Sequence, residues 1–333
     1  MKKVLSLILA LAMVFALAAC GEKQPSNDGN TDGDKSARGN VIMTFGTADT
    51  GGSMYPAGAA VSQVWTNNVE GVKCNTQTST GSFQNCQDVS TGEVDVAVAT
   101  SDVVLNAYNG TGKFADIGKL DNLRVIGAVY TSVLSGVALK SSGLTYIHDL
   151  LGKRVAVGPA ASATENATLA AFGVMGIDSS NTSLENLGLG DGADSVGDGI
   201  LDAAFGFAGL PIGGQLNLAA TKEIQVLDMT QEEIDKVLAG NAAYIQTKIP
   251  AGTYTGQDND ANTFGVKCLI IVTADMDADL VYDLCKAMNE HTEEMAAGNA
   301  LLKDMTDPSF LCTQMPIPLH DGAQKYYSEQ GLI

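Results

Sequence analysis

Residues 46–65 read GTADTGGSMYPAGAAVSQVW and follow a short apolar run, Val41–Thr44. The first eight letters have the form G-x-x-x-x-G-G-S. They differ from the phosphate-binding loop G-x-x-x-x-G-K-[ST] at one position, where Gly52 replaces the lysine. Pro56 suits the first turn of a helix, and apolar residues recur at helical spacing from Ala57 to Trp65. The stretch therefore predicts a strand, a glycine loop and a helix whose free N–H groups can bind an anion without a cation.

The first 19 residues, MKKVLSLILALAMVFALAA, place two lysines before an unbroken apolar run that ends in small residues. This pattern is typical of a secretory signal peptide. The letters LAAC at 17–20 look like the lipobox of bacterial lipoproteins, so we predict cleavage before Cys20 and its lipidation. An ordinary signal with a chance cysteine is the alternative. Residues 20–39 are polar and predict the lipidated cysteine and a flexible linker. We expect a protein outside the cytoplasm, anchored by lipid to the bacterial cell membrane at the cell surface or in the periplasm.

Composition narrows the possible partners. The 333 residues include 38 acidic and 19 basic side chains, a net charge of −19, which argues against a nucleic-acid partner. Five cysteines remain after Cys20, an odd number without C-x-x-C or Cys/His spacing, so a zinc site is not expected. A Cys74–Cys86 bridge stays open. We expect no metal, no cofactor and a monomer.

Apolar blocks and glycine-rich loops alternate along the chain and predict an α/β fold with parallel-rich sheets flanked by helices. Strands are predicted at Val41–Gly46, Val72–Thr78, Val94–Thr100, Leu123–Tyr130, Leu134–Lys140, Arg154–Gly158, Asp202–Phe207, Ile224–Leu227 and Gly265–Thr273. Helices are predicted at Ala57–Trp65, Phe83–Ser90, Val103–Tyr108, Thr164–Gly176, Pro211–Ala220, Gln231–Leu238 and Ala278–Ala297.

Two extended segments, near 134–140 and 264–273, bound an inserted middle section of the chain. Two crossing strands of this kind form the hinge of a two-lobed binding protein, which closes around a ligand. We predict a first lobe made of 40–137 plus 268–333 and a second lobe made of 138–267.

Six predicted strands end in loops rich in Gly, Ser and Thr. Because ligands bind beyond the carboxyl ends of strands in open α/β sheets, these loops predict a polar small-molecule site. Each loop taken alone is an ordinary turn. The loops are 46–56, 79–82, 100–102, 130–132, 158–165 and 205–211.

None of these loops contains Lys or Arg, so a ligand carboxylate would be held by helix N-termini, amides and hydroxyls. Asp49, Asp102 or Glu165 could receive an ammonium group. The alternative for each is a helix-end charge, since acids favour helix N-termini.

Enzyme signatures are absent from the sequence, which contains no G-x-S-x-G and no H-E-x-x-H. His148, His291 and His320 do not follow predicted strands, which disfavours a secreted hydrolase. GLGDGA (188–193) matches a dinucleotide fingerprint but stands late in a secreted chain, so a turn is predicted there. We expect a protein that is not an enzyme.

FGTADTGGSMYPAGAAVSQVW (45–65) resembles the first strand, loop and helix of the TAXI family, the solute receptors of TRAP-type secondary transporters. Further resembling stretches are TSTGSFQNCQDVSTGEVDVAVATSDVVLNAYNGTG (78–112), DLLGKRVAVG (149–158), LDAAFGFAGLP (201–211), IPAGTYTGQD (249–258) and PIPLHDGAQKYY (316–327). The resemblance covers about residues 41–333.

The resemblance implies a two-lobed, type II periplasmic-binding-protein-like fold that captures glutamate, glutamine, 2-oxoglutarate or a similar carboxylate or amino acid for a TRAP membrane permease. It assigns ligand contacts to Thr47, Thr50, Gly51, Gly52, Ser53, Tyr55, Ser79, Thr80, Gly81, Ser82, Ser101, Asp102, Tyr130, Ser162, Thr164, Glu165, Phe207, Ala208 and Gly209. The family loop P-G-S-G-T-E differs here, with alanine at 161 and 163. A sensor module for a membrane kinase and the binding protein of an ATP-driven (ABC) importer are the alternatives.

Overall fold

The computed structural model describes residues 39–333. The signal peptide predicted at 1–19, the lipidated Cys20 and nearly all of the predicted linker lie outside the described residues. Within 39–333, every helix is too short or too polar to cross a membrane.

The strands in the described part of the chain form one sheet in the order β2-β1-β3-β10-β4-β7-β5-β6, with β8 beside β4 and β9 beside β10. Pairs within β1–β3 and within β5–β7 are parallel, whereas β4 and β10 run antiparallel to their neighbours. The strands are β1 Val41–Gly46, β2 Val72–Gln77, β3 Val96–Thr100, β4 Leu123–Leu139, β5 Arg154–Ala156, β6 Ser183–Glu185, β7 Ala203–Ala208, β8 Ile224–Val226, β9 Ile245–Ile249 and β10 Ala261–Thr273.

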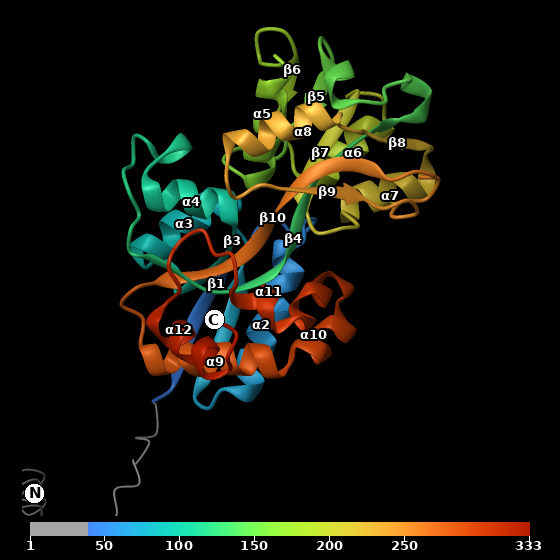
Figure 1. Cartoon of the computed structure of the whole chain (residues 1–333). Helices are drawn as coiled ribbons and strands as arrows, with labels where there is room; N and C mark the ends of the chain where they lie inside the picture. Colours follow the sequence, from blue (N-terminus) through green and yellow to red (C-terminus); the bar gives the residue numbers. More distant parts are fainter. Residues whose placement is uncertain (1–38) are drawn as a thin grey trace, which may run out of the picture. The chain divides into compact units, whose positions relative to one another are not determined.

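The two longest strands, β4 and β10, run through both halves of the sheet (Figure 1). The first half of β4 pairs with the end of β10 beside β3, and its second half pairs with β7 and β8. We call β1–β3 with their helices the first lobe and β5–β9 with theirs the second lobe. The two-lobed α/β fold with a hinge of two crossing strands is confirmed.

Helices cover both faces of each lobe. In the first lobe, α2, α9 and α12 pack on one another, while α3 and α4 cover the opposite face. In the second lobe, α5 packs with α8, and α6 packs with α7. The helices are α2 Met54–Asn68, α3 Ser82–Thr91, α4 Ser101–Asn109, α5 Ala163–Val174, α6 Leu189–Gly197, α7 Gly213–Thr221, α8 Gln231–Gly240, α9 Ala278–Glu290, α10 Thr292–Gly298, α11 Pro308–Cys312 and α12 Asp321–Glu329. Short 3-10 turns are η1 Gly112–Phe114, η2 Lys140–Ser142, η3 Ile147–Leu150 and η4 Ala300–Thr306.

The opening stretch is anchored by its own apolar face. Trp65 of α2 is fully buried, stacks on Phe45 of β1 at 5.4 Å, and donates its indole N–H to the carbonyl of Leu284 in α9. Burying a side chain of this size contributes about 2–3 kcal/mol. The packing fixes the start of α2 at the carboxyl end of β1.

Three elements differ from the sequence prediction. The predicted strands Leu123–Tyr130 and Leu134–Lys140 are one continuous strand, because β10 pairs along both parts. The predicted helix Ala278–Ala297 is two helices, α9 and α10, that meet at His291. The turn predicted at 188–193 is wrong, since Leu189 begins α6, where Leu189, Ala193 and Val196 share a buried face.

Sequence reasoning also missed β6, β9, α11 and α12. The sheet is mixed rather than built from parallel units alone, because the hinge strands each serve two lobes. The residue boundaries 40–137 plus 268–333 and 138–267 stay a prediction.

Candidate functional site

A pocket lies where the carboxyl ends of β1, β2, β5 and β7 meet, beside β4. Its atom-free space is about 410 Å³, part of it open to solvent. Both lobes contribute to it. The lining residues are Ala48, Asp49, Gly52, Ser53, Met54, Thr80, Gly81, Ser82, Tyr130, Pro159, Ser162, Ala163, Thr164, Leu189, Phe207 and Ala208.

Four helices of residues 39–333 begin at this pocket: α2, α3, α5 and α6. Gly81 precedes α3 with φ 115°, a conformation that favours glycine, and Ser162 caps α5 by accepting from the Glu165 N–H. The first N–H groups of a helix have no partner within the helix, and its N-terminus carries about half a positive charge. The pocket is therefore favourable for an anion.

Tyr130 of β4 forms part of the pocket wall. Its side chain is 1% exposed, and its hydroxyl makes no hydrogen bond of good geometry with the described residues. Burial, together with the neighbouring Cys268, raises the pKa of Tyr130 well above its ordinary value. The hydroxyl therefore stays protonated and is a neutral donor at the pocket.

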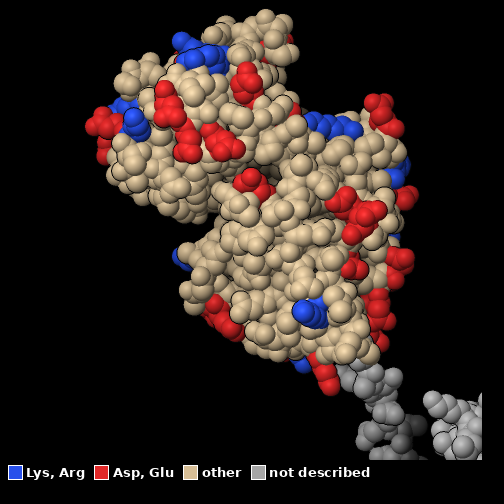
Figure 2. Space-filling view, turned by 180° about the vertical axis from the view of Figure 1, so that it is seen from behind, with Lys and Arg blue, Asp and Glu red and all other residues tan. Residues whose placement is uncertain are grey.

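The pocket lining contains one charged side chain and no Lys, Arg or His. That residue is Asp49, which is exposed and accepts a hydrogen bond from the Gly51 N–H at 2.7 Å. The face of the molecule in Figure 2 carries scattered acidic side chains and no continuous patch of Lys and Arg. Electrostatic attraction of an anion at this site would come from the helix N-termini.

The structure brings ten of the predicted ligand contacts to the pocket: Gly52, Ser53, Thr80, Gly81, Ser82, Tyr130, Ser162, Thr164, Phe207 and Ala208. Nine others do not line it: Thr47, Thr50, Gly51, Tyr55, Ser79, Ser101, Asp102, Glu165 and Gly209. Tyr55 faces a hollow between α2 and α10, and Ser101 faces another beside β9. Thr47 and Ser79 hydrogen-bond within the first lobe. Ligand contact by any of these residues stays a prediction.

The two buried acids proposed as ammonium acceptors have protein partners. Asp102 in α4 accepts hydrogen bonds from Asn166 Nδ2 at 2.8 Å and from the Tyr244 hydroxyl at 3.1 Å, both in the second lobe. Glu165 in α5 forms an ion pair with Lys113 of the first lobe. Burial would raise the pKa of Glu165, but its hydrogen bonds, with Lys113 first, outweigh burial and lower it.

These contacts join the lobes around the pocket. A further one links Ser53, before α2, to the Gly209 carbonyl after β7 at 3.1 Å. The structure therefore shows the lobes closed upon each other at the pocket.

Sequence reasoning missed Leu189, Met54 and Ala48 as lining residues. Leu189 was hidden by the glycines of 188–193, although the spacing of Leu189, Ala193 and Val196 is a helix signal. Cys74 and Cys86 are buried free thiols and form no bridge. Burial raises the pKa of Cys74 to about 11.

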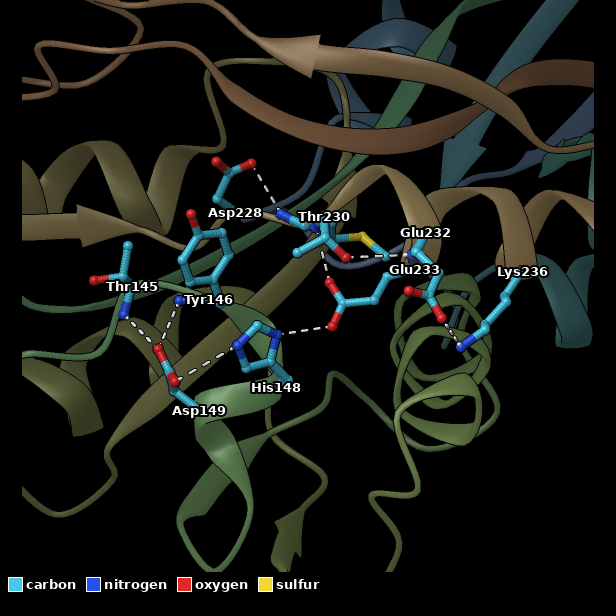
Figure 3. Close-up of polar contacts among 10 residues, drawn as sticks. Thr145, Tyr146, His148, Asp149, Asp228, Thr230, Glu232, Glu233 and Lys236 are labelled. Atoms are coloured by element: carbon cyan, nitrogen blue, oxygen red, sulfur yellow. Dashed lines mark hydrogen bonds and ion pairs between the residues drawn. The ribbon is translucent and has the colours of Figure 1, made fainter.

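A second polar cluster lies in the second lobe, away from the pocket (Figure 3). His148 Nδ1 lies 2.8 Å from Glu233 Oε1, and its ring stacks on Tyr146. Asp149 accepts the N–H groups of Thr145 and Tyr146. These carboxylates satisfy backbone groups, so the cluster ties η3 to the start of α8.

The fold and the pocket between the lobes define the class of this protein as a periplasmic-binding-protein-like, two-lobed architecture. The chain matches the model of the NMT1-like family over residues 45–331 and belongs to that family, a family of periplasmic substrate-binding proteins.

Solved structures share the fold at low identity. The alkanesulfonate-binding protein SsuA from Xanthomonas axonopodis pv. citri, bound to MOPS, has a TM-score of 0.51 and 14% identity. The match covers 88% of this chain and 85% of that one. The aliphatic sulphonate-binding protein SsuA from Escherichia coli gives 0.45 and 13%, over 87% and 78%. An ancestral arginine-binding protein bound to arginine gives 0.46 and 11%, over 82% and 98%.

Proposed function

We propose that the protein is the extracytoplasmic, lipid-anchored receptor of a TAXI-type TRAP transporter. It captures a small carboxylate of the glutamate, glutamine or 2-oxoglutarate kind by lobe closure and delivers it to a membrane permease. The observation that carries the proposal is the meeting of four helix N-termini at one pocket without a basic side chain. The transporter type rests on the resemblance of the sequence stretches quoted above.

Closure gives the site its affinity in this proposal. A carboxylate between the N-termini of α2 and α3 in the first lobe and those of α5 and α6 in the second is attracted by both lobes. The ligand therefore favours the closed form over the open one. A ligand shifts such an equilibrium only through its greater affinity for one state, which a site divided between lobes provides.

Thermal unfolding of the purified full chain tests the carboxylate ligand. The panel contains glutamate, glutamine, 2-oxoglutarate, succinate and a neutral sugar as control. A ligand at 100 times its Kd stabilises the folded state by about 2.7 kcal/mol, which raises Tm by several degrees. We expect such a rise with at least one carboxylate and none with the sugar. No rise with any acid, in protein shown by mass spectrometry to be ligand-free, contradicts the proposal.

The energy source for uptake tests the transporter type. A TRAP transporter is a secondary transporter, so ligand uptake by cells should stop when an ionophore collapses their ion gradients. Uptake that continues without the gradient and stops on ATP depletion would instead favour an ABC importer.

A further inference from the structure

We infer that the pocket selects ligands with a single carboxylate and an uncharged remainder, with the Tyr130 hydroxyl as a neutral hydrogen-bond donor to them. The inference rests on the proposed function and narrows its ligand class. It separates glutamine-like from glutamate-like solutes, which the proposed function leaves together.

The charges around the pocket disfavour a second carboxylate. Asp49 is the one charged residue of the lining, and its sign repels an anion. The cation nearest in the structure's interlobe contacts, Lys113, is already paired with Glu165. A carboxylate buried without a cation or sufficient hydrogen bonds is costly, so a dicarboxylate would leave one group uncompensated.

The helix N-termini suffice for one carboxylate. The helices α2, α3, α5 and α6 have between nine and fifteen residues, long enough for each to present free N–H groups and partial positive charge. This positive potential is concentrated at the helix starts and falls off within the first turn. A carboxylate bound there leaves the remainder of the ligand outside its reach.

The remainder of the pocket is neutral. Met54, Leu189 and Phe207 supply apolar wall, and Tyr130 supplies a fully buried hydroxyl without a protein partner of good geometry. Nearly all buried polar groups in proteins have a partner, so an unpaired hydroxyl on a pocket wall indicates a ligand group that accepts from it. Burial keeps this hydroxyl neutral, so it hydrogen-bonds an amide or carbonyl without compensating a second charge.

Two ligand pairs test the selection by isothermal titration calorimetry on the purified full chain at pH 7. Glutamine and glutamate have nearly the same size and differ by one carboxylate, as do 2-oxovalerate and 2-oxoglutarate in chain length. In the pair that binds tighter, we expect the single carboxylate to have a Kd at least tenfold lower. Equal or tighter binding of the dicarboxylate overturns the inference and leaves the proposed function standing. Absence of binding in both pairs overturns both.

Paired tyrosine variants test the donor. Tyr130→Phe removes a hydroxyl without a partner, so we expect unchanged or higher Tm and at least fivefold weaker binding of the tighter ligand. Tyr254→Phe is the matched control, because the Tyr254 hydroxyl bonds Ile212 and Gln215 outside the pocket. It should lower Tm and leave Kd unchanged. Unchanged affinity in Tyr130→Phe overturns the role of the hydroxyl.

Discussion

Ala161 shows how one residue records a departure from the resembling family. Its φ of 59° lies in the left-handed region, where a side chain costs about 1–2 kcal/mol. The family loop has glycine at this position. Here the alanine is held in place by its N–H, which donates to Glu165 Oε2 at 2.8 Å. The loop beside Ser162 and the start of α5 therefore carries backbone strain at the pocket.

Ala161→Gly should raise the free energy of unfolding by roughly 0.5–1 kcal/mol, because glycine adopts positive φ without the side-chain clash. Urea unfolding monitored by circular dichroism measures the change. Ala163→Gly is the matched control two residues away. Ala163 begins helix α5, so its replacement should instead lower stability by about the same amount. A change of the same sign in both variants would contradict the assignment of strain to Ala161.

At the scale of the element, α8 is defined by its first turn. The Thr230 side chain accepts from the Glu233 N–H at 3.3 Å, and the Glu233 carboxylate accepts from the Thr230 N–H at 2.8 Å. The same carboxylate contacts His148, which fixes η3 against the helix (Figure 3). Burial would raise the pKa of Glu233, but the bonds from Thr230 and His148 outweigh it and lower the pKa.

Thr230→Ala should lower the free energy of unfolding by about 1 kcal/mol, the usual loss on removing a helix N-cap. Chemical denaturation of the full chain measures it. Thr230→Ser retains the capping hydroxyl and should recover most of the loss. If the alanine variant is as stable as the parent, the capping box contributes nothing to the second lobe.

At the scale of the whole molecule, the lobes are joined by a buried carboxylate. Asp102 of α4 is 0% exposed and accepts from Asn166 and Tyr244 of the other lobe. Burial raises its pKa from the model-compound value of 3.8, and the hydrogen bonds only partly oppose that. Because the folded protein binds the proton more tightly than the unfolded chain, this group's contribution to stability falls as pH rises from about 4 through the raised pKa.

Asp102→Asn should remove this pH dependence. We expect the stability of the parent, relative to the variant, to decrease as pH is raised from 4, and the variant to be at least as stable at pH 8. Urea midpoints of both proteins from pH 4 to 8 give the difference curve, in which the shared titrating groups cancel. A difference that does not vary with pH would show that folding leaves the pKa of Asp102 unchanged.

The sequence could predict much of the fold because the informative patterns are local. Strand β1, the loop after it and α2 were identified from apolar spacing, glycines and Pro56, and each depends on residues within one turn or strand. Leu189 escaped because its glycine-rich surroundings favour a turn, whereas packing of α6 on β7 and α7 decides for the helix.

The sequence by itself determined the α/β class, the two lobes and the small polar loops at the strand ends, because these follow from local periodicity and loop chemistry. Tertiary structure decided which loops share one pocket, since β4 and β10 carry the second lobe back over the first. It separated Tyr55 from the pocket and brought Asp102 to Asn166 and Tyr244 across the lobe boundary. Such contacts join residues far apart in the chain, and their geometry depends on how the sheet curls and where the lobes meet.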